Sequence, residues 1–326
     1  MVTVSVIVPI YNAADYLNRL LGSLHAQTLN GMEFILVLDC PKDDSDAIAT
    51  AWAEQDTRFR VIRNTTNLHI GQTRNVGLEY ATGEYVAFAD DDDYMEGNMY
   101  EQLYRIAVRQ SSDIVVSVPC VDKDGVHRHE QVPYSTDSHQ QRELMLKSMV
   151  SSGGKEHQCS PYCNLHNNIY RRNLLYKHNI RFVKTPNITP EDLLFNIETT
   201  WFAERTDFVN HSFYYHCIRT DSSGKRQDYL DWQGRIDGIQ HLYSFLQKED
   251  TTHAYTESFY QYAQKQGMRS LLDLLYVQHN PQAFWQACRQ VRTYPWSKEV
   301  FGNYAYDRSL RLRSRIVRYL TAKLLT

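Results

Sequence analysis

Four aspartates stand side by side at positions 90–93, at the end of the stretch EYVAFAD (84–90). Carboxylates packed this closely raise one another's pKa unless a positive charge balances them. A divalent cation supplies that charge, and Mg²⁺ and Mn²⁺ both bind carboxylate oxygens while bridging to diphosphate oxygens. The run therefore predicts a Mn²⁺ or Mg²⁺ site that holds a diphosphate. The alternative is a solvated acidic turn.

The elements before this run alternate between strands and helices. Apolar stretches predict strands at 2–9, 32–39, 59–64 and 84–90, and helical periodicity predicts helices at about 14–27, within 40–56 and within 70–83, where Gly83 would stop the helix. This alternation favours an α/β fold with a mainly parallel sheet and helices on both faces. Ligands of such sheets sit beyond the carboxyl ends of the strands. We therefore expect three polar clusters, at 9–12, 39–46 and 90–93, to line one crevice.

The rest of the chain carries weaker patterns. A helix is predicted at about 98–110 and a strand at 113–120. The polar stretch 121–160 is expected to be irregular apart from a helix at 140–150. From about residue 227 onward the pattern is helical and rich in aromatic residues.

Composition argues against several classes of protein. The net charge of −3 gives no overall attraction to nucleic acid, so no nucleic-acid partner is expected. The six cysteines are scattered, which predicts reduced thiols and a cytoplasmic protein. Cys159 and Cys163, flanked by His157 and His166, could mimic a zinc site, but their spacing departs from that of zinc fingers. The first residues lack a basic region, so no signal peptide is expected, and the sequence contains no stretch of about 18 apolar residues.

Phosphate-binding glycine loops are missing from the sequence. No G-x-G-x-x-G follows the first predicted strand, and no G-x-x-x-x-G-K-[ST] occurs. A bound diphosphate would therefore be held by a metal and by side chains, as an Asp-x-Asp site does.

Several motifs together resemble those of family 2 glycosyltransferases, which have the GT-A fold. The resemblance is carried by VSVIVPIYN (4–12), ILVLDCPKDDS (35–45) and IGQTRNVGLEYATGEYVAFADDDDY (70–94). Farther on, NNIYRRNLL (167–175), PEDLLFN (190–196) and FYYHCIRTDSS (213–223) are similar to the acceptor half of bacterial members. The resemblance covers about residues 2 to 225.

The resemblance implies both an organisation and an activity. It places a nucleotide-sugar-binding half at 1–110, an acceptor-binding half at 111–226 and a helical C-terminal region at 227–326. It implies an inverting, metal-dependent transferase whose donor is a nucleoside-diphosphate sugar, with a UDP-sugar as the leading candidate. The acceptor would be a saccharide or lipid-linked saccharide in surface-polysaccharide synthesis. Alternatives are a non-catalytic sugar-nucleotide-binding protein and a nucleotidyltransferase, although the latter would carry a Gly-rich loop.

Three residues at the first two strand ends match the family's positions for base and ribose: Pro9, Tyr11 and Asp39. Tyr11 could stack on a pyrimidine. Asp39 could accept hydrogen bonds from a ring N–H or a ribose hydroxyl, or it could instead cap the following turn. The family often has paired aspartates followed by Gly-Ser here, whereas this chain has Leu-Asp-Cys-Pro at 38–41.

The next motif positions are assigned by the same resemblance. Arg74 matches a nucleotide-side arginine that reaches the base or the phosphates, with a surface helix arginine as the alternative. Asp90 is expected at the ribose or a metal-bound water, and Asp92 at the metal itself. Asp91 and Asp93 would support these two or cap the loop.

Sugar transfer also needs a base that takes the proton from the attacking hydroxyl. Glu191 and Asp192 begin a predicted helix, where acids also serve as ordinary dipole partners. The resemblance implies Asp192 as the base, with Glu191 orienting or replacing it. His216 or Arg219 could assist the leaving diphosphate, and His216 could be a third metal ligand or simply a structural histidine.

The stretch 308–325 contains six basic residues and no acid. Four arginines fall on one side of a predicted helix, namely 308, 311, 315 and 318. This pattern suits peripheral contact with anionic lipid at the inner face of the cell membrane. The alternative is a final helix packed on the body of the protein.

Overall fold

The computed structural model describes residues 2–150, 161–183, 191–218, 232–302 and 323–325. The chain divides into two compact units, of which the first comprises Met1–Leu146, Ser160–Pro186 and Glu191–Ser222 and the second comprises Lys147–Cys159, Asn187–Pro190 and Ser223–Thr326. Arg219 and most of the basic C-terminal stretch lie outside the described residues. The division of the first 226 residues into donor and acceptor halves stays a prediction.

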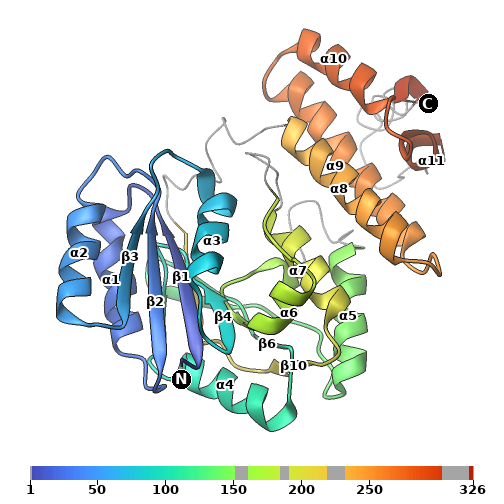
Figure 1. The fold of residues 1–326 in the computed structure, drawn as a ribbon. Coiled ribbons are helices and arrows are strands. Elements are labelled where there is room, and N and C mark those ends of the chain that lie inside the picture. The colour runs from blue at the N-terminus through green and yellow to red at the C-terminus, as the bar shows by residue number, and fades with distance from the viewer. Residues whose placement is uncertain (1, 151–160, 184–190, 219–231, 303–322, 326) are drawn as a thin grey trace. The chain divides into compact units, whose positions relative to one another are not determined.

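A seven-stranded sheet forms the centre of the first unit, in the order β10-β6-β9-β4-β1-β2-β3 (Figure 1). Its strands are β1 (Val4–Ile10), β2 (Met32–Leu38), β3 (Phe59–Arg63), β4 (Tyr85–Phe88), β6 (Ile114–Ser117), β9 (Asn168–Arg171) and β10 (Thr206–Val209). Neighbouring strands run parallel except β9, which is antiparallel to both β4 and β6. The predicted α/β class with a mainly parallel sheet is confirmed.

Helices cover both faces of this sheet (Figure 1). Those of the first unit are α1 (Ala14–His25), α2 (Ser45–Gln55), α3 (His69–Tyr80), α4 (Met99–Gln110), α6 (Arg172–Lys177) and α7 (Glu191–Phe202), while α5 (Ser138–Val150) crosses into the second unit. The even-numbered residues of β1 share a core cluster with the apolar stripe of α1, namely Leu17, Leu20, Leu21 and Leu24. Because side chains of a strand alternate between faces, Ile7 points the other way, toward Gly77 of α3.

Gly77 lets α3 lie close to the sheet. A Cβ at this position would lie 2.3 Å from Cγ2 of Ile7. We expect Gly77→Ala to lower the free energy of unfolding by about 1–3 kcal/mol, because overpacking a core costs more than the helix gains from alanine. Urea unfolding measures this. The control is Gly22→Ala on α1, where a Cβ meets nothing within 4 Å and stability should be equal or higher; an equal loss in both variants would contradict the packing argument.

The predicted helix stop at Gly83 is wrong. Helix α3 ends at Tyr80, and Ala81 is its C-cap with an extended backbone. Gly83 instead lies against β1, where its N–H donates to Ser5 Oγ at 2.8 Å and a Cβ would lie 2.6 Å from the Ser5 backbone nitrogen. The glycine is therefore needed for close approach between two segments and does not end the helix.

A second sheet was missed by the sequence patterns. It has four strands in the order β5-β11-β7-β8: β5 (Tyr94–Met95), β11 (Tyr214–Cys217), β7 (Cys120–Lys123) and β8 (Val126–His129). The prediction of irregular structure over 121–160 is thus wrong for β7 and β8. Strand β8 is exposed along its whole length and carries no alternation of apolar residues, so nothing in its sequence distinguishes it from a loop.

The second unit is helical in its described part, which confirms the pattern predicted from residue 227. It contains α8 (Trp232–Glu249), α9 (Thr256–Tyr276), α10 (Pro281–Val291) and α11 (Ser297–Gly302). None of the described helices is both long enough and apolar enough to cross a membrane.

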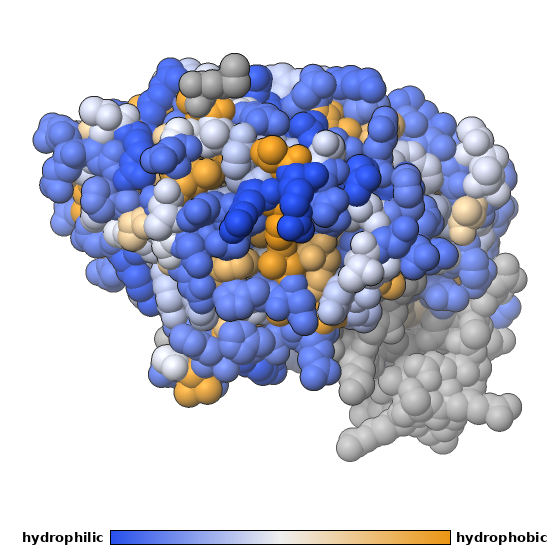
Figure 2. All heavy atoms as spheres, turned by 90° about the horizontal axis from the view of Figure 1, so that it is seen from below, coloured by the Kyte–Doolittle hydropathy of each residue, from blue (hydrophilic) through white to orange (hydrophobic). Residues whose placement is uncertain are grey.

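On the face that Figure 2 shows, hydrophilic side chains predominate among the described residues and apolar ones gather in small groups.

The prediction of fully reduced cysteines is also wrong. Cys163, at the end of the short 3-10 helix Pro161–Cys163, is disulfide-bonded. Cys40, Cys120, Cys217 and Cys288 are free thiols. Sequence spacing does not show which sulfurs lie within bonding distance, so the sequence could not predict this disulfide. Cys159 and His157 of the zinc alternative lie outside the described residues, and His166 points elsewhere, as described below.

Candidate active site

The carboxyl ends of β1, β2 and β4 bring the three polar clusters together, as predicted. The backbone N–H of Tyr11 donates to Asp91 Oδ2 at 2.9 Å, which ties the aspartate run to the end of β1. Asn12 Oδ1 accepts from the N–H of Lys42 at 2.7 Å, which ties the same end to the loop after β2. Each bond joins segments that are far apart in the sequence.

The three predicted base-and-ribose residues differ in exposure. Pro9 is buried inside β1. Tyr11 is 45% exposed, so its ring is accessible for stacking. Asp39 is buried, and its Oδ1 accepts from Asn64 Nδ2 and from the N–H of Leu68, both at 2.8 Å. Asp39 therefore supports the start of α3.

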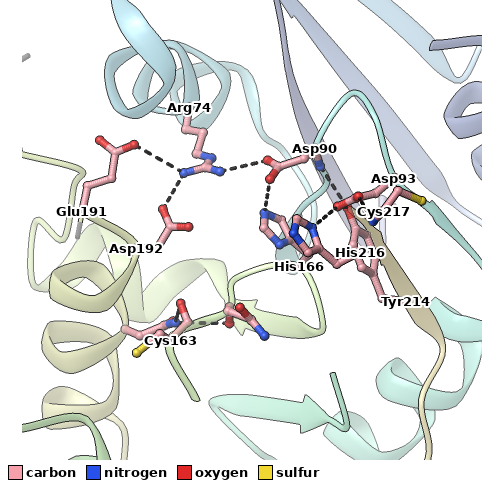
Figure 3. Close-up of polar contacts among 12 residues, drawn as sticks. Arg74, Asp90, Asp93, Cys163, His166, Glu191, Asp192, Tyr214, His216 and Cys217 are labelled. Carbon is pink, nitrogen blue, oxygen red and sulfur yellow. Dashed lines mark hydrogen bonds and ion pairs between the residues drawn. The ribbon is translucent and has the colours of Figure 1, made fainter. Parts of the chain in front are cut away.

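Asp90 lies between two cations (Figure 3). Arg74 Nη2 lies 2.9 Å from its Oδ1, and His166 Nε2 lies 2.9 Å from its Oδ2. Burial alone would disfavour the charged form, but His166 and Arg74 outweigh it and hold the pKa of Asp90 well below its ordinary value. The contact to His166 is an ion pair without an aligned hydrogen bond, so the buried Nε2 has no hydrogen-bond partner.

Asp93 joins the aspartate run to β11. Its Oδ1 accepts from the N–H of Cys217 at 2.8 Å, and its Oδ2 accepts from the Tyr214 hydroxyl at 2.9 Å. His216 Nδ1 lies 3.4 Å from the same Oδ2, and this hydrogen bond raises the pKa of His216 to about 9. Tyr214 also accepts from the N–H of Asp90 at 3.0 Å. One tyrosine thus fixes both ends of the run.

The described residues include one set of side chains grouped tightly enough to hold a metal ion. Ligand atoms of Asp90, Asp93 and His166 all lie within 4.8 Å of one another. Two carboxylates suit Mg²⁺ and Mn²⁺, and an imidazole favours Mn²⁺ because Mg²⁺ prefers oxygen. The donor set therefore fits the predicted ion. Asp92 and His216, the ligands predicted from sequence, are outside this group, and their role as ligands stays a prediction.

Arg74 connects this cluster to the predicted base. Its side chain is 1% exposed, which excludes the surface-arginine alternative. Nη1 lies 2.6 Å from Asp192 Oδ1 and 3.8 Å from Glu191 Oε1, while Nη2 binds Asp90 (Figure 3). Burial opposes its charge, but Asp192 first, then Asp90 and Glu191, keep the pKa of Arg74 raised. In this structure the terminal nitrogens of Arg74 bind carboxylates, and its predicted contact with a nucleotide stays a prediction.

Burial and neighbouring charges shift the pKa of Glu191 in the opposite direction from that of Asp90. Desolvation by burial raises the pKa of Glu191 to about 7, and Arg74 only partly offsets this. When folding raises the pKa of a carboxyl, the folded chain is relatively most stable below the unfolded pKa, where the carboxyl is protonated in both states. That relative stability is lost as the pH rises through the folded pKa. Glu191 therefore destabilises the folded chain progressively between about pH 4 and pH 8.

Glu191→Gln should remove this pH dependence. We expect the variant to match the unmodified chain at pH 4.5 and to exceed it at pH 8 by up to about 3 kcal/mol, since each pKa unit corresponds to about 1.4 kcal/mol. Urea unfolding at both pH values measures the difference. Glu198→Gln on the same helix is the control. A pH-independent effect of Glu191→Gln would contradict the burial argument.

Sequence reasoning missed two residues of the site. His166 was noticed only as part of a zinc alternative, and Tyr214 only as part of a motif. Both contact Asp90 from far away in the sequence, His166 by 76 positions and Tyr214 by 124. The rings stack on each other with centroids 5.3 Å apart. The only signal for His166 was its place next to the motif NNIYRRNLL at 167–175.

The arrangement is that of a GT-A fold. An open, mostly parallel sheet carries carboxylates and histidines at the carboxyl ends of its strands. These side chains face a helix that begins with a carboxylate pair. The sequence model of Glycosyl transferase family 2 matches residues 5–208, and the chain belongs to this family. It is a glycosyltransferase.

Curated relatives agree with this assignment, and solved structures agree with the fold. The chain is 33% identical over 218 residues to the uncharacterized glycosyltransferase EpsJ of Bacillus subtilis, covering 65% of this chain and 60% of EpsJ. Residues 1–349 of TarS from S. aureus, solved with UDP-GlcNAc, have a TM-score of 0.70 at 20% identity, with 99% of this chain and 89% of that chain covered. The mannosyltransferase PcManGT from Pyrobaculum calidifontis, solved with GDP-Man and Mn²⁺, has a TM-score of 0.52 at 14% identity, with 99% and 84% covered.

Proposed function

We propose that the protein is an inverting, metal-dependent glycosyltransferase that uses a nucleoside-diphosphate sugar, first of all a UDP-sugar. The acceptor would be a hydroxyl of a saccharide or lipid-linked saccharide in surface-polysaccharide synthesis. The observation that carries this proposal is the Arg74 bridge. One buried guanidinium binds Asp90 at the strand ends and Asp192 at the start of α7, so a donor-side carboxylate and a candidate base share one cation.

Asp192 would act as the base. Arg74 Nη1 lies 2.6 Å from its Oδ1 and holds the carboxylate at the start of α7. Deprotonation of the acceptor hydroxyl as it attacks the anomeric carbon would displace the nucleoside diphosphate in one step and invert that carbon. Glu191, whose pKa burial raises to about 7, would orient Asp192 or replace it as the base, because a general base works best with a pKa near the operating pH.

The diphosphate would be held at the aspartate run. A bound divalent ion would supply electrostatic stabilisation for the charge that develops on the leaving diphosphate. Asp90, with Asp93 and His166 beside it, offers a matching donor set, and Asp92 and His216 remain candidates. The Mn²⁺ present with PcManGT supports a divalent ion in this fold.

The nucleoside would lie across the ends of β1 and β2. The exposed ring of Tyr11 offers a stacking surface for a base. Asp39 is held in place by Asn64 and Leu68, ready to accept from a ring N–H or a ribose hydroxyl. The UDP-GlcNAc bound to TarS supports a uridine nucleotide. Arg219 stays a candidate for the diphosphate.

A cytoplasmic location at the inner face of the cell membrane is part of the proposal. It rests on the basic stretch 308–325, most of which lies outside the described residues, and on an acceptor that could be lipid-linked. Co-sedimentation with vesicles containing anionic lipid should be lost when four arginines of this stretch are replaced by glutamine. Equal co-sedimentation of both forms would remove the membrane contact from the proposal.

A screen of nucleotide sugars tests the central activity. The chain is incubated with UDP-, GDP- and TDP-sugars in Mn²⁺, in Mg²⁺ and in EDTA, and both thermal shift and nucleoside-diphosphate release are followed. The proposal expects one donor to give a metal-dependent shift and metal-dependent release. A shift without release under any acceptor condition would indicate a binding protein instead. Neither shift nor release with any donor would overturn the proposal.

A further inference from the structure

Helix α3 meets the start of α7 through one narrow face. Gly71 and Arg74 are three residues apart and therefore lie on the same side of the helix. Glycine inside a helix costs about 0.5–1 kcal/mol relative to alanine. Its presence in the first turn of α3 therefore calls for a packing reason.

The reason is the Glu191 side chain. A Cβ built on Gly71 would lie 2.2 Å from Glu191 Oε2 and 3.1 Å from its Cδ. It would also lie 3.4 Å from Phe182 Cβ, which is ordinary contact. The carboxyl of Glu191 thus occupies the space that any side chain at position 71 would fill.

The same helix fixes Phe182, which lies under Arg74. Asn75 donates to the Phe182 carbonyl at 2.8 Å and accepts from its N–H at 2.9 Å. The Phe182 ring lies 5.3 Å from the Arg74 guanidinium carbon and stacks on Phe195 of α7 at 4.4 Å. Helix α3 therefore contacts the start of α7 in two ways. Arg74 binds the carboxylates of Glu191 and Asp192, and Gly71 and Phe182 pack beside them.

We propose that Gly71 and Arg74 are positioning residues that set the place of Asp192 relative to Asp90, with Gly71 acting through Glu191. This proposal rests on the proposed function. Arg74 fixes the distance by binding both carboxylates, and Gly71 lets the start of α7 approach α3 closely enough for that bond to form. An extra methyl group at position 71 would displace the Glu191 carboxyl, which is the end of a flexible side chain, and we expect this displacement to disturb the carboxylates that Arg74 binds.

The test is a double-mutant cycle of Gly71→Ala and Glu191→Ala, with kcat and the donor KM measured for each variant. Gly71→Ala alone should lower kcat by about 10–100-fold, because a shift on the order of 1 Å is that costly, and should leave the donor KM nearly unchanged. In the Glu191→Ala background it should change kcat by less than about twofold, because the atom that the methyl group strikes is gone.

Gly77→Ala is the matched control. It lies on the same helix and creates an equally short contact, but with Ile7 of the sheet. It should lower stability while leaving kcat of the folded enzyme within about twofold, since its methyl group meets no site residue. Gly71→Ala with Glu191→Asp, which shortens the acid by one methylene group, should restore part of the lost kcat.

Three results would overturn the inference. One is an unchanged kcat in Gly71→Ala, another is an equal fold-loss in both backgrounds, and the third is a loss of kcat in Gly77→Ala as large as that in Gly71→Ala. If Gly71→Ala does not fold alone, the comparison of Glu191→Ala with its Gly71→Ala double variant decides. A chain that releases no nucleoside diphosphate from any donor would instead refute the proposed function, and the inference with it.

Discussion

Asp192→Asn should lower kcat for sugar transfer by about 10²–10⁴-fold with little change in the donor KM, because it removes the base and leaves the donor pocket in place. The asparagine Oδ1 can still accept from Arg74 Nη1, which lies 2.6 Å from the aspartate oxygen, so the local structure should be kept. Release of nucleoside diphosphate at saturating acceptor measures kcat, and donor titration gives KM.

The control for this variant is Asp46→Asn. Asp46 pairs with Arg63 on the exposed side of α2, with 45% of its side chain exposed, so its loss should leave kcat unchanged and cost at most about 1 kcal/mol of stability. If Asp192→Asn kept more than half of the activity of the unmodified enzyme, Asp192 would not be the base. Glu191→Gln would then be the next variant to test.

Arg74→Ala should be the most damaging single change to the fold of the site. It would leave Asp90, Glu191 and Asp192 without the buried cation that they share, and breaking such a network costs about 3–5 kcal/mol. Activity should fall at least as far as in Asp192→Asn. Urea unfolding and kcat measure the two effects on the same sample.

Arg74→Lys separates charge from geometry. A lysine ammonium keeps the positive charge, but it is one compact donor and cannot reproduce two contacts made by separate guanidinium nitrogens. We expect most of the stability to return and kcat to stay low. Arg63→Ala, on the exposed surface, is the matched control and should change neither quantity by much. Full recovery of kcat in Arg74→Lys would show that the bridge itself is not needed.

The sheet and the acidic cluster could be predicted because both depend on local patterns. Strands such as β1 are apolar along their whole length, and α1 repeats its leucines at helical spacing. Parallel strands place their carboxyl ends at one edge, so the aspartates at 90–93 and the loops after β1 and β2 had to meet. Their order along the chain was enough for that conclusion.

The assignment of individual aspartates could not be reached this way. In the structure Asp91 binds the end of β1, Asp93 binds β11 and Asp90 binds two cations. These partners lie up to 124 positions away, and nothing within a run of four identical residues tells which one faces which partner. The turn after β4 makes that choice. The same holds for Gly71, whose role depends on a contact across 120 positions with Glu191.

The most direct test of the account is anomalous diffraction at the manganese edge from crystals of Asp192→Asn grown with Mn²⁺ and the donor chosen by the screen. We expect a manganese peak among the carboxylates of residues 90–93, the diphosphate next to it, and the anomeric carbon facing position 192. A diphosphate bound elsewhere, with Asp90 still held only by Arg74 and His166, would contradict the account.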